Sequence, residues 1–148
     1  MYTIGQLSKM FNIPISTLRY YDKEGLFPNI KRSSGIRIFT DMEIEAIHVI
    51  ECLKKSNLEI KEIKKFMKWC EQGSATYSNR LELFKNQKEV VETKLKDLES
   101  VLSMIKYKCW YYEQAEKFSS EENIHSMLPD KLPKDIQELF DKSHINKE

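Results

Sequence analysis

The stretch ISTLRYYDKEGLFP, residues 15–28, decides the fold of this chain. A proline precedes it, and the pattern predicts a short helix that runs from Ser16 to about Glu24. Ser16 is a suitable N-cap, and Gly25 is suited to the left-handed position just past the end of a helix. Tyr20 and Tyr21 point about 100° apart on such a helix, so we expect Tyr20 outward and Tyr21 partly inward.

A second short helix is predicted just before this one. Ile4, Leu7 and Phe11 recur at helical spacing, and Thr3 is a plausible N-cap. Asn12-Ile13-Pro14 interrupts the pattern. Two short helices joined by a turn of three to four residues are typical of a helix-turn-helix, whose second helix enters the DNA major groove.

The segment IKRSSGIRIF, residues 30–39, predicts a β-hairpin around Ser33-Ser34-Gly35. A charged hairpin alone is usually a solvated turn. Directly after a helix-turn-helix, however, Lys31, Arg32 and Arg37 indicate a wing that lies against DNA.

The candidate DNA contacts come from these two elements. The first residues of the recognition helix lie near base edges, arginine binds guanine or phosphate, and lysine and tyrosine reach phosphate. The predicted contact residues are Ser16, Thr17, Arg19, Tyr20, Lys23, Arg32 and Arg37.

The distribution of charge agrees with a nucleic-acid partner. The whole chain of 148 residues carries a net charge of only +1. Residues 1–40 nevertheless hold six basic and two acidic side chains, a local net charge of +4. A basic N-terminal segment on a nearly neutral remainder is typical of an electrostatic footprint for DNA.

Two further helices and a long one follow the hairpin. The sequence Thr40-Asp41-Met42-Glu43 has the capping-box pattern and opens a helix that ends near Lys55. Asn57, which tolerates left-handed dihedral angles, makes the next turn, and a helix over about 59–72 follows.

Residues 78–118 show a sustained heptad pattern. The a positions are Leu81, Lys88, Leu95, Leu102 and Cys109, and the d positions are Phe84, Val91, Leu98, Ile105 and Tyr112. Five such heptads predict a coiled coil. A helix of ~40 residues is about 60 Å long, too long to bury this stripe on a small N-terminal unit, so we expect a homodimer.

The predicted organisation is therefore mainly α. We expect a winged helix-turn-helix DNA-binding domain over 1–73 and a dimerising coiled-coil helix over 74–118. A short tail over 119–148 is expected to be loosely docked, with short helices around 121–127 and 134–141.

The order of these elements, together with TLRYYDKEGL and GIRIF, resembles the MerR family of bacterial transcription regulators. The resemblance implies a homodimer with antiparallel coiled coils that binds a nearly palindromic operator in promoter DNA. It also implies that the protein bends and untwists this DNA, which realigns the promoter elements for RNA polymerase. It assigns Ser16, Thr17, Arg19 and Tyr20 to the recognition helix and Arg37 to the wing. Phe39 departs from the wing tyrosine usual in the family, and Asn57 from a common glycine.

Cys52 is the candidate sensor. The stretch VIECLKKSNLEI, residues 49–60, is similar to the thiol-responsive NmlR/AdhR branch, which implies a response to aldehydes and other electrophiles. His48 and Lys55 share the helical face of Cys52 and favour thiolate, whereas the nearby helix C-terminus opposes it. The alternative is a buried structural thiol.

The other cysteines are expected to be packing residues: Cys109 at a heptad a position and Cys70 in the core. No metal site or cofactor is expected, because the three cysteines lack metal-ligand spacing. The aromatic side chains Trp69, Trp110, Tyr111 and Tyr112 leave a small-ligand pocket as an alternative sensor. We expect them instead to pack the end of the coiled coil against the partner's DNA-binding unit.

Other protein classes are weakly supported. No signal peptide or membrane-length apolar run is visible, so a cytoplasmic protein with reduced thiols is expected. An enzyme is not expected, because no nucleophile–base pair or phosphate-binding loop is evident. A coiled-coil module that binds protein rather than DNA stays an alternative.

Overall fold

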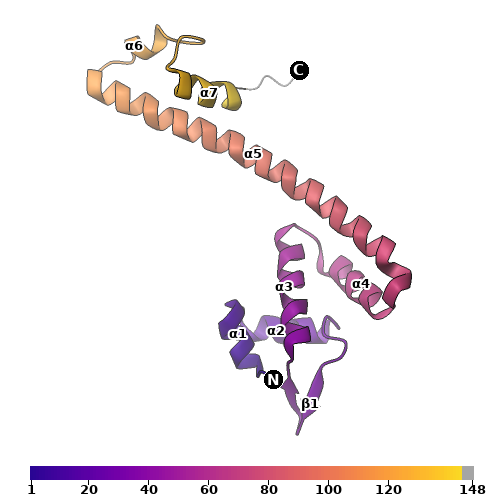
Figure 1. The fold of residues 1–148 in the computed structure, drawn as a ribbon. Helices are drawn as coiled ribbons and strands as arrows, with labels where there is room; N and C mark the ends of the chain where they lie inside the picture. The colour runs from indigo at the N-terminus through magenta and orange to yellow at the C-terminus, as the bar shows by residue number, and fades with distance from the viewer. Residues whose placement is uncertain (145–148) are drawn as a thin grey trace. The chain divides into compact units, whose positions relative to one another are not determined.

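The computed structural model describes residues 1–144 (Figure 1). In chain order the elements are α1 (Ile4–Phe11), α2 (Ile15–Lys23), β1 (Lys31–Ser33), β2 (Ile36–Ile38), α3 (Asp41–Lys55), α4 (Ile60–Glu71), the 3₁₀ turn η1 (Gly73–Thr76), α5 (Tyr77–Phe118), α6 (Glu122–His125) and α7 (Lys134–Ser143). They form two compact units, Met1–Val90 and Val91–Glu148. The mainly α fold with a helix-turn-helix, a two-stranded wing and one long following helix confirms the predicted fold class.

The start of the recognition helix α2 differs from the prediction. The carbonyl of Pro14 accepts the first helical bonds, from Thr17 N at 2.9 Å and Leu18 N at 3.2 Å. The helix therefore begins at Ile15, one residue earlier than expected, and no side chain caps it. Because Pro14 occupies the N-cap position, the hydroxyl of Ser16 is not needed as a cap.

Caps and left-handed residues set the other helix ends as predicted. Thr3 and Thr40 form capping boxes at the starts of α1 and α3. Gly25 has φ of 77° and Asn57 has φ of 67°. In both cases the next residue donates its N–H back into the helix, Leu26 to Tyr21 O and Leu58 to Leu53 O, each at 3.0 Å. Asn57 thus adopts the left-handed conformation that this turn requires.

The wing is a tight antiparallel hairpin. Its two-residue turn places Ser34 and Gly35 at positive φ, which matches the twist of the strands. Phe39, at its end, exchanges two backbone hydrogen bonds with Tyr2, at 2.8 and 3.0 Å. The wing is therefore tied to the N-terminus of the chain.

A single apolar core holds the first unit together. It combines side chains from α1, α2, α3 and α4 with the segment after α2, and its fully buried members include Leu7, Leu18, Leu26, Phe39, Ile47, Ile50 and Ile63. The first turns of α5 join it, since the Phe84 ring packs edge-on against Phe66 at 5.4 Å between centroids. This core fixes the position of α2 relative to α3.

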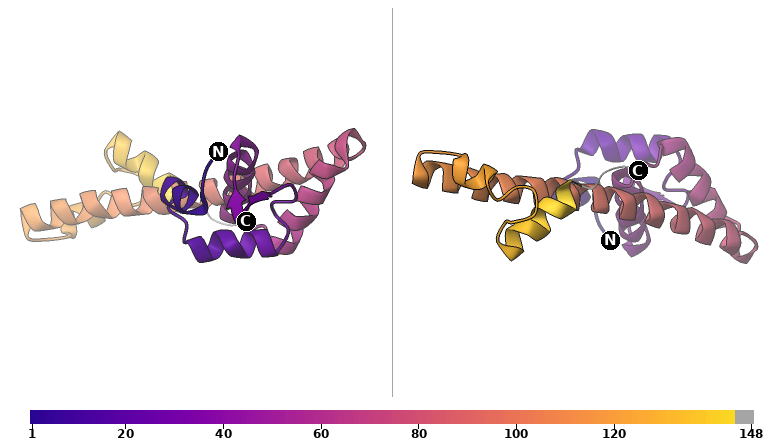
Figure 2. Two further views of the ribbon diagram at one scale, coloured as in Figure 1. Left: turned by 90° about the horizontal axis from the view of Figure 1, so that it is seen from below. Right: turned by 90° about the horizontal axis from the view of Figure 1, so that it is seen from above.

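The second unit corrects the expectation of a loosely docked tail. Figure 2 shows α6 and α7 folded back beside the end of α5. The two predicted short helices are present, but they pack: Ile124 is fully buried and Leu132 and Ile136 are nearly so, against Tyr107 and Tyr111 of α5. The apolar residues of the tail are too far apart to look periodic, yet three helices bring them together.

Candidate nucleic-acid interface

One face of α2 carries the predicted contact residues. Ser16, Arg19, Tyr20 and Lys23 are all exposed, and their spacing of i, i+3, i+4 and i+7 places them on one side of the helix. Thr17 lies half-buried at the edge of this face, which we call the recognition face. It combines two positive charges with two hydroxyl groups, a set that binds phosphate and base edges.

The adjacent tyrosines divide as predicted. The Tyr20 side chain is 45% exposed, whereas Tyr21 is 1% exposed. The Tyr21 hydroxyl donates to Glu51 Oε1 at 2.6 Å and accepts from Lys54 Nζ at 2.6 Å. Burial and the bond to Glu51 raise the pKa of Tyr21 well above its usual value. Tyr21 therefore connects the recognition helix to α3. The sequence did not predict these hydrogen bonds, because Glu51 and Lys54 are 30 and 33 residues away from Tyr21.

The wing arginines lie beside the recognition helix. Arg37 Nε donates to Asp22 Oδ2 at 2.6 Å, and an Arg32 terminal nitrogen reaches the same oxygen at 3.3 Å. Asp22 was not among the predicted site residues, since an acidic side chain is not expected to contact DNA. Asp22 connects the recognition helix α2 to the wing, the two elements that are predicted to contact DNA.

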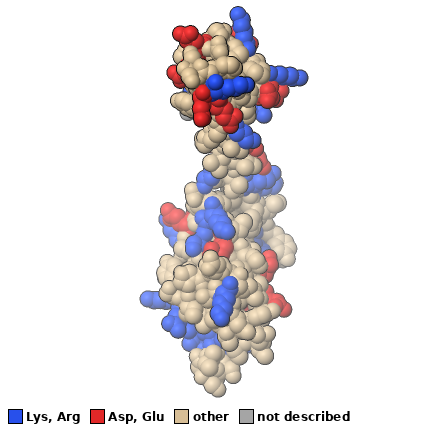
Figure 3. Space-filling model, turned by 90° about the vertical axis from the view of Figure 1, so that its left-hand side faces the viewer, with Lys and Arg blue, Asp and Glu red and all other residues tan. Residues whose placement is uncertain are grey.

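The charge of the first unit is visible on its surface. Figure 3 shows Lys and Arg side chains gathered along the lower left edge of this unit. The two acidic side chains at the end of the recognition helix form ion pairs with basic residues of the same unit. Asp22 pairs with the wing arginines, and the Glu24 carboxylate lies 3.9 Å from Lys64 Nζ. The exposed basic residues of α2, Arg19 and Lys23, thus dominate its outer face.

Cys52 lies exposed on α3. The alternative of a buried structural thiol is therefore wrong. The His48 ring, one turn earlier, packs edge-on against Phe11 of α1 at 4.8 Å between centroids. Glu51, the residue next to Cys52, is the one that accepts the hydrogen bond from Tyr21. The thiol is accessible and lies next in sequence to the contact between α3 and the recognition helix.

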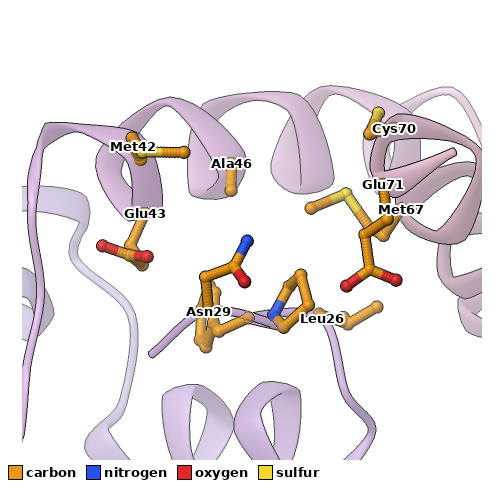
Figure 4. A pocket seen from close by; sticks show the side chains of 10 residues that line it. Leu26, Asn29, Met42, Glu43, Ala46, Met67, Cys70 and Glu71 are labelled. Carbon is orange, nitrogen blue, oxygen red and sulfur yellow. The ribbon is translucent and has the colours of Figure 1, made fainter. Parts of the chain in front are cut away.

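Cys70 is also exposed, so its expected place in the core is wrong. It borders a cavity of about 180 Å³ between the loop 26–29, the start of α3 and the end of α4. Figure 4 shows Met42 and Ala46 on one side of this cavity and Met67 and Cys70 on the other. Met67, which belongs to the buried face of α4, lines the same cavity, and Cys70 lies one turn further on, at the exposed end of the helix.

The four aromatic residues of the alternative sensor lie in different units of the chain. Trp69 belongs to the first unit, where it lines a second cavity of about 230 Å³. Trp110 and Tyr111 belong to the second unit and pack with this chain's own tail helices. Tyr111 is 5% exposed and donates to Glu121 Oε1 at 2.9 Å. The tail helices, which were not predicted as packing partners, cover Tyr111, whereas Tyr112 stays 59% exposed in the single chain.

Two other features concern metals and membranes. Within residues 1–144, no three His, Cys, Asp or Glu side chains lie close enough together to hold a metal ion. Over the same residues, no helix has an apolar stretch of the length that a bilayer crossing requires.

Comparison with known proteins identifies the family. Residues 2–69 match the family model described as MerR HTH family regulatory protein. An uncharacterised HTH-type transcriptional regulator of Haemophilus influenzae is 34% identical, over 84% of this chain and 93% of the relative. The regulator AdhR of Bacillus subtilis is 31% identical, over 58% of this chain and 62% of its own.

A solved structure extends the likeness to the fold. HiNmlR, described as a MerR family regulator that lacks the sensor domain and is bound to promoter DNA, superimposes with a TM-score of 0.72. It is 35% identical and covers 82% of this chain and 98% of its own. With its helix-turn-helix, its wing and these relatives, the chain belongs to the MerR family of DNA-binding transcription regulators.

Proposed function

We propose that this chain binds promoter DNA as a homodimer and activates transcription in response to electrophile or thiol stress through Cys52. The recognition face carries the proposal: an exposed row of Ser16, Arg19, Tyr20 and Lys23 beside a wing with two arginines. In HiNmlR a similar fold is bound to promoter DNA. We assign residues 1–73 to DNA binding and 74–118 to dimerisation.

The apolar stripe of α5 supports the homodimer. We use this name for the heptad a and d residues, of which Leu81, Phe84, Val91, Leu95, Leu98, Leu102, Ile105 and Tyr112 are 40–65% exposed in the single chain. A row of large apolar side chains that stays exposed after folding is typical of an interface. The second chain would lie antiparallel, as the family resemblance implies.

Regulation would then act through the shape of the operator. Two recognition helices held on one dimer reach two half-sites, and bending or untwisting of the DNA between them realigns promoter elements for RNA polymerase. Modification of exposed Cys52 would alter α3, whose Glu51 and Lys54 hold Tyr21 of the recognition helix. This contact offers a physical route from the thiol to the DNA.

DNA binding is tested by selecting sites from a pool of random duplexes with the full chain. The selected duplex and a scrambled one are then titrated at several salt concentrations. Arg19 and Lys23 supply four charges per dimer, and the wing arginines raise this to eight. The slope of log affinity against log salt is therefore expected between about −4 and −7. A flat salt response, or no preference for the selected site, would refute DNA recognition.

The sensor is tested on the operator-bound dimer with bacterial RNA polymerase. A limiting dose of a reactive aldehyde should modify Cys52 ahead of Cys70 and Cys109, read by peptide mass spectrometry, and should change the yield of transcript. Cys52→Ser should abolish this change, whereas the matched controls Cys70→Ser and Cys109→Ser should keep it. An aldehyde response that persists in Cys52→Ser contradicts the assignment.

A further inference from the structure

The wing contains an arrangement that is unfavourable by itself. Arg32 and Arg37 lie directly opposite each other across β1 and β2. Like charges at directly opposed cross-strand positions repel and destabilise the pair. Each strand has only three residues, and the bonds between Phe39 and Tyr2 hold the base of the hairpin but not this arginine pair.

Asp22 of the recognition helix offsets this repulsion. Its Oδ2 accepts a hydrogen bond from Arg37 at 2.6 Å and one from Arg32 at 3.3 Å. The Asp22 side chain is 11% exposed, so its bond to Arg37 is shielded from water and salt more than a surface ion pair. One carboxylate thus holds both arginines, and through them the wing, against α2.

The arginines keep donors for a second partner. Within residues 1–144, Arg37 uses only Nε toward Asp22, and no residue of the chain binds its terminal nitrogens. A planar guanidinium that is held through Nε turns its two terminal nitrogens away from the carboxylate, where they can bind a phosphate oxygen. The bond to Asp22 therefore aligns the phosphate-binding group before DNA arrives.

We propose that Asp22 is a positioning residue that sets the wing on the recognition helix and so determines how strongly the protein prefers its own operator over random DNA. The inference rests on the proposed DNA-binding function. Without the carboxylate the wing arginines keep their charge but lose their alignment. Random DNA, which is bound by charge alone, stays well bound, whereas the operator, which needs wing and helix in register, is bound less well.

The experiment compares Asp22→Asn with Glu24→Gln, each as the full-length dimer. Both variants remove one negative charge from nearly the same place, but Glu24 pairs with Lys64 and not with the wing. Affinity for the selected operator and for a scrambled duplex of equal length is measured at one salt concentration. Thermal unfolding establishes that each variant is folded.

Asp22→Asn is expected to lower the ratio of operator to random-DNA affinity by roughly tenfold, about what one charge-assisted hydrogen bond is worth. Its affinity for random DNA should not fall, and Glu24→Gln should leave the ratio within about twofold of the wild type. Asp22→Glu, which keeps a carboxylate, should restore most of the ratio. Equal ratios in Asp22→Asn and Glu24→Gln, or a parallel loss of both affinities, would overturn the inference.

Arg37→Lys is a second variant that decides the question if Asp22→Asn does not fold. It keeps a positive charge for phosphate but lacks the Nε–H that reaches Asp22, so the ratio should fall in the same direction. An unchanged ratio in Arg37→Lys refutes the positioning role. A wild-type protein that shows no operator preference refutes the proposed function instead, so the two failures are distinguishable.

Discussion

Replacing Tyr21 by phenylalanine should destabilise the first unit by about 1–2 kcal/mol. The hydroxyl makes two hydrogen bonds of 2.6 Å, one to Glu51 and one from Lys54. Hydrogen bonds to charged groups contribute about 1.5–3 kcal/mol each when a partner is left buried and unsatisfied. Glu51 is 25% and Lys54 38% exposed, so water replaces the lost hydroxyl at both groups. The total cost is therefore expected at about 1–2 kcal/mol, below the sum for two buried bonds.

The ring itself would stay in place, because its edge-on packing against Phe27 does not involve the hydroxyl. Urea unfolding at one fixed protein concentration is the measurement, since the stability of a dimer depends on concentration. The midpoint should fall without a change in the slope of the transition.

Tyr20→Phe is the matched control. It deletes the same hydroxyl from the neighbouring residue, whose side chain is 45% exposed, so the free energy of unfolding should change by less than about 0.5 kcal/mol. Operator affinity should fall in this variant instead. Equal stability losses in the two variants, or no loss in Tyr21→Phe, would refute the assignment of Tyr21 to α3.

Three further predictions address the rest of the chain. Leu98→Glu changes a side chain that is 65% exposed in the single chain, so helicity by circular dichroism should persist while sedimentation at micromolar concentration shows monomers. Asn57→Ala replaces a residue that tolerates left-handed dihedral angles by one that rarely adopts φ of 67°, and should cost up to about 1 kcal/mol in urea unfolding, whereas Asn57→Gly should not destabilise the chain. Burial and the bond to Glu121 raise the pKa of Tyr111 from 10.0 to about 12. Between these pH values the unfolded chain has lost the proton that the folded chain keeps, so stability falls as pH rises, and Tyr111→Phe should flatten this fall in alkaline unfolding.

Local signals in the sequence were sufficient for most of the fold. Thr3 and Thr40 indicate the starts of helices, because a capping box involves only residues three positions apart. Gly25 and Asn57 indicate turns, because few residue types adopt positive φ. The outward Tyr20 and inward Tyr21 follow from helix geometry once the helix is placed. Each of these inferences needs no knowledge of distant residues.

Features that depend on distant contacts could not be predicted in this way. Asp22 meets Arg32 and Arg37 only after the hairpin folds back, and nothing in its local sequence distinguishes it from a solvated acid. Ile124 and Ile136 look isolated in a charged tail until three helices bring them together. Cys70 was expected inside because it follows the apolar spacing of α4, yet the cavity beside it leaves it exposed.

The apolar stripe of α5 has a consequence for gene dosage. If single chains must pair over this stripe before two recognition helices can span an operator, the amount of competent regulator is fixed by mass action. Below the dissociation constant of the dimer, its concentration rises with the square of the chain concentration. Halving the supply of chains would then leave about a quarter of the dimers, so promoter occupancy would respond more steeply to synthesis and degradation of this protein than a monomeric regulator could.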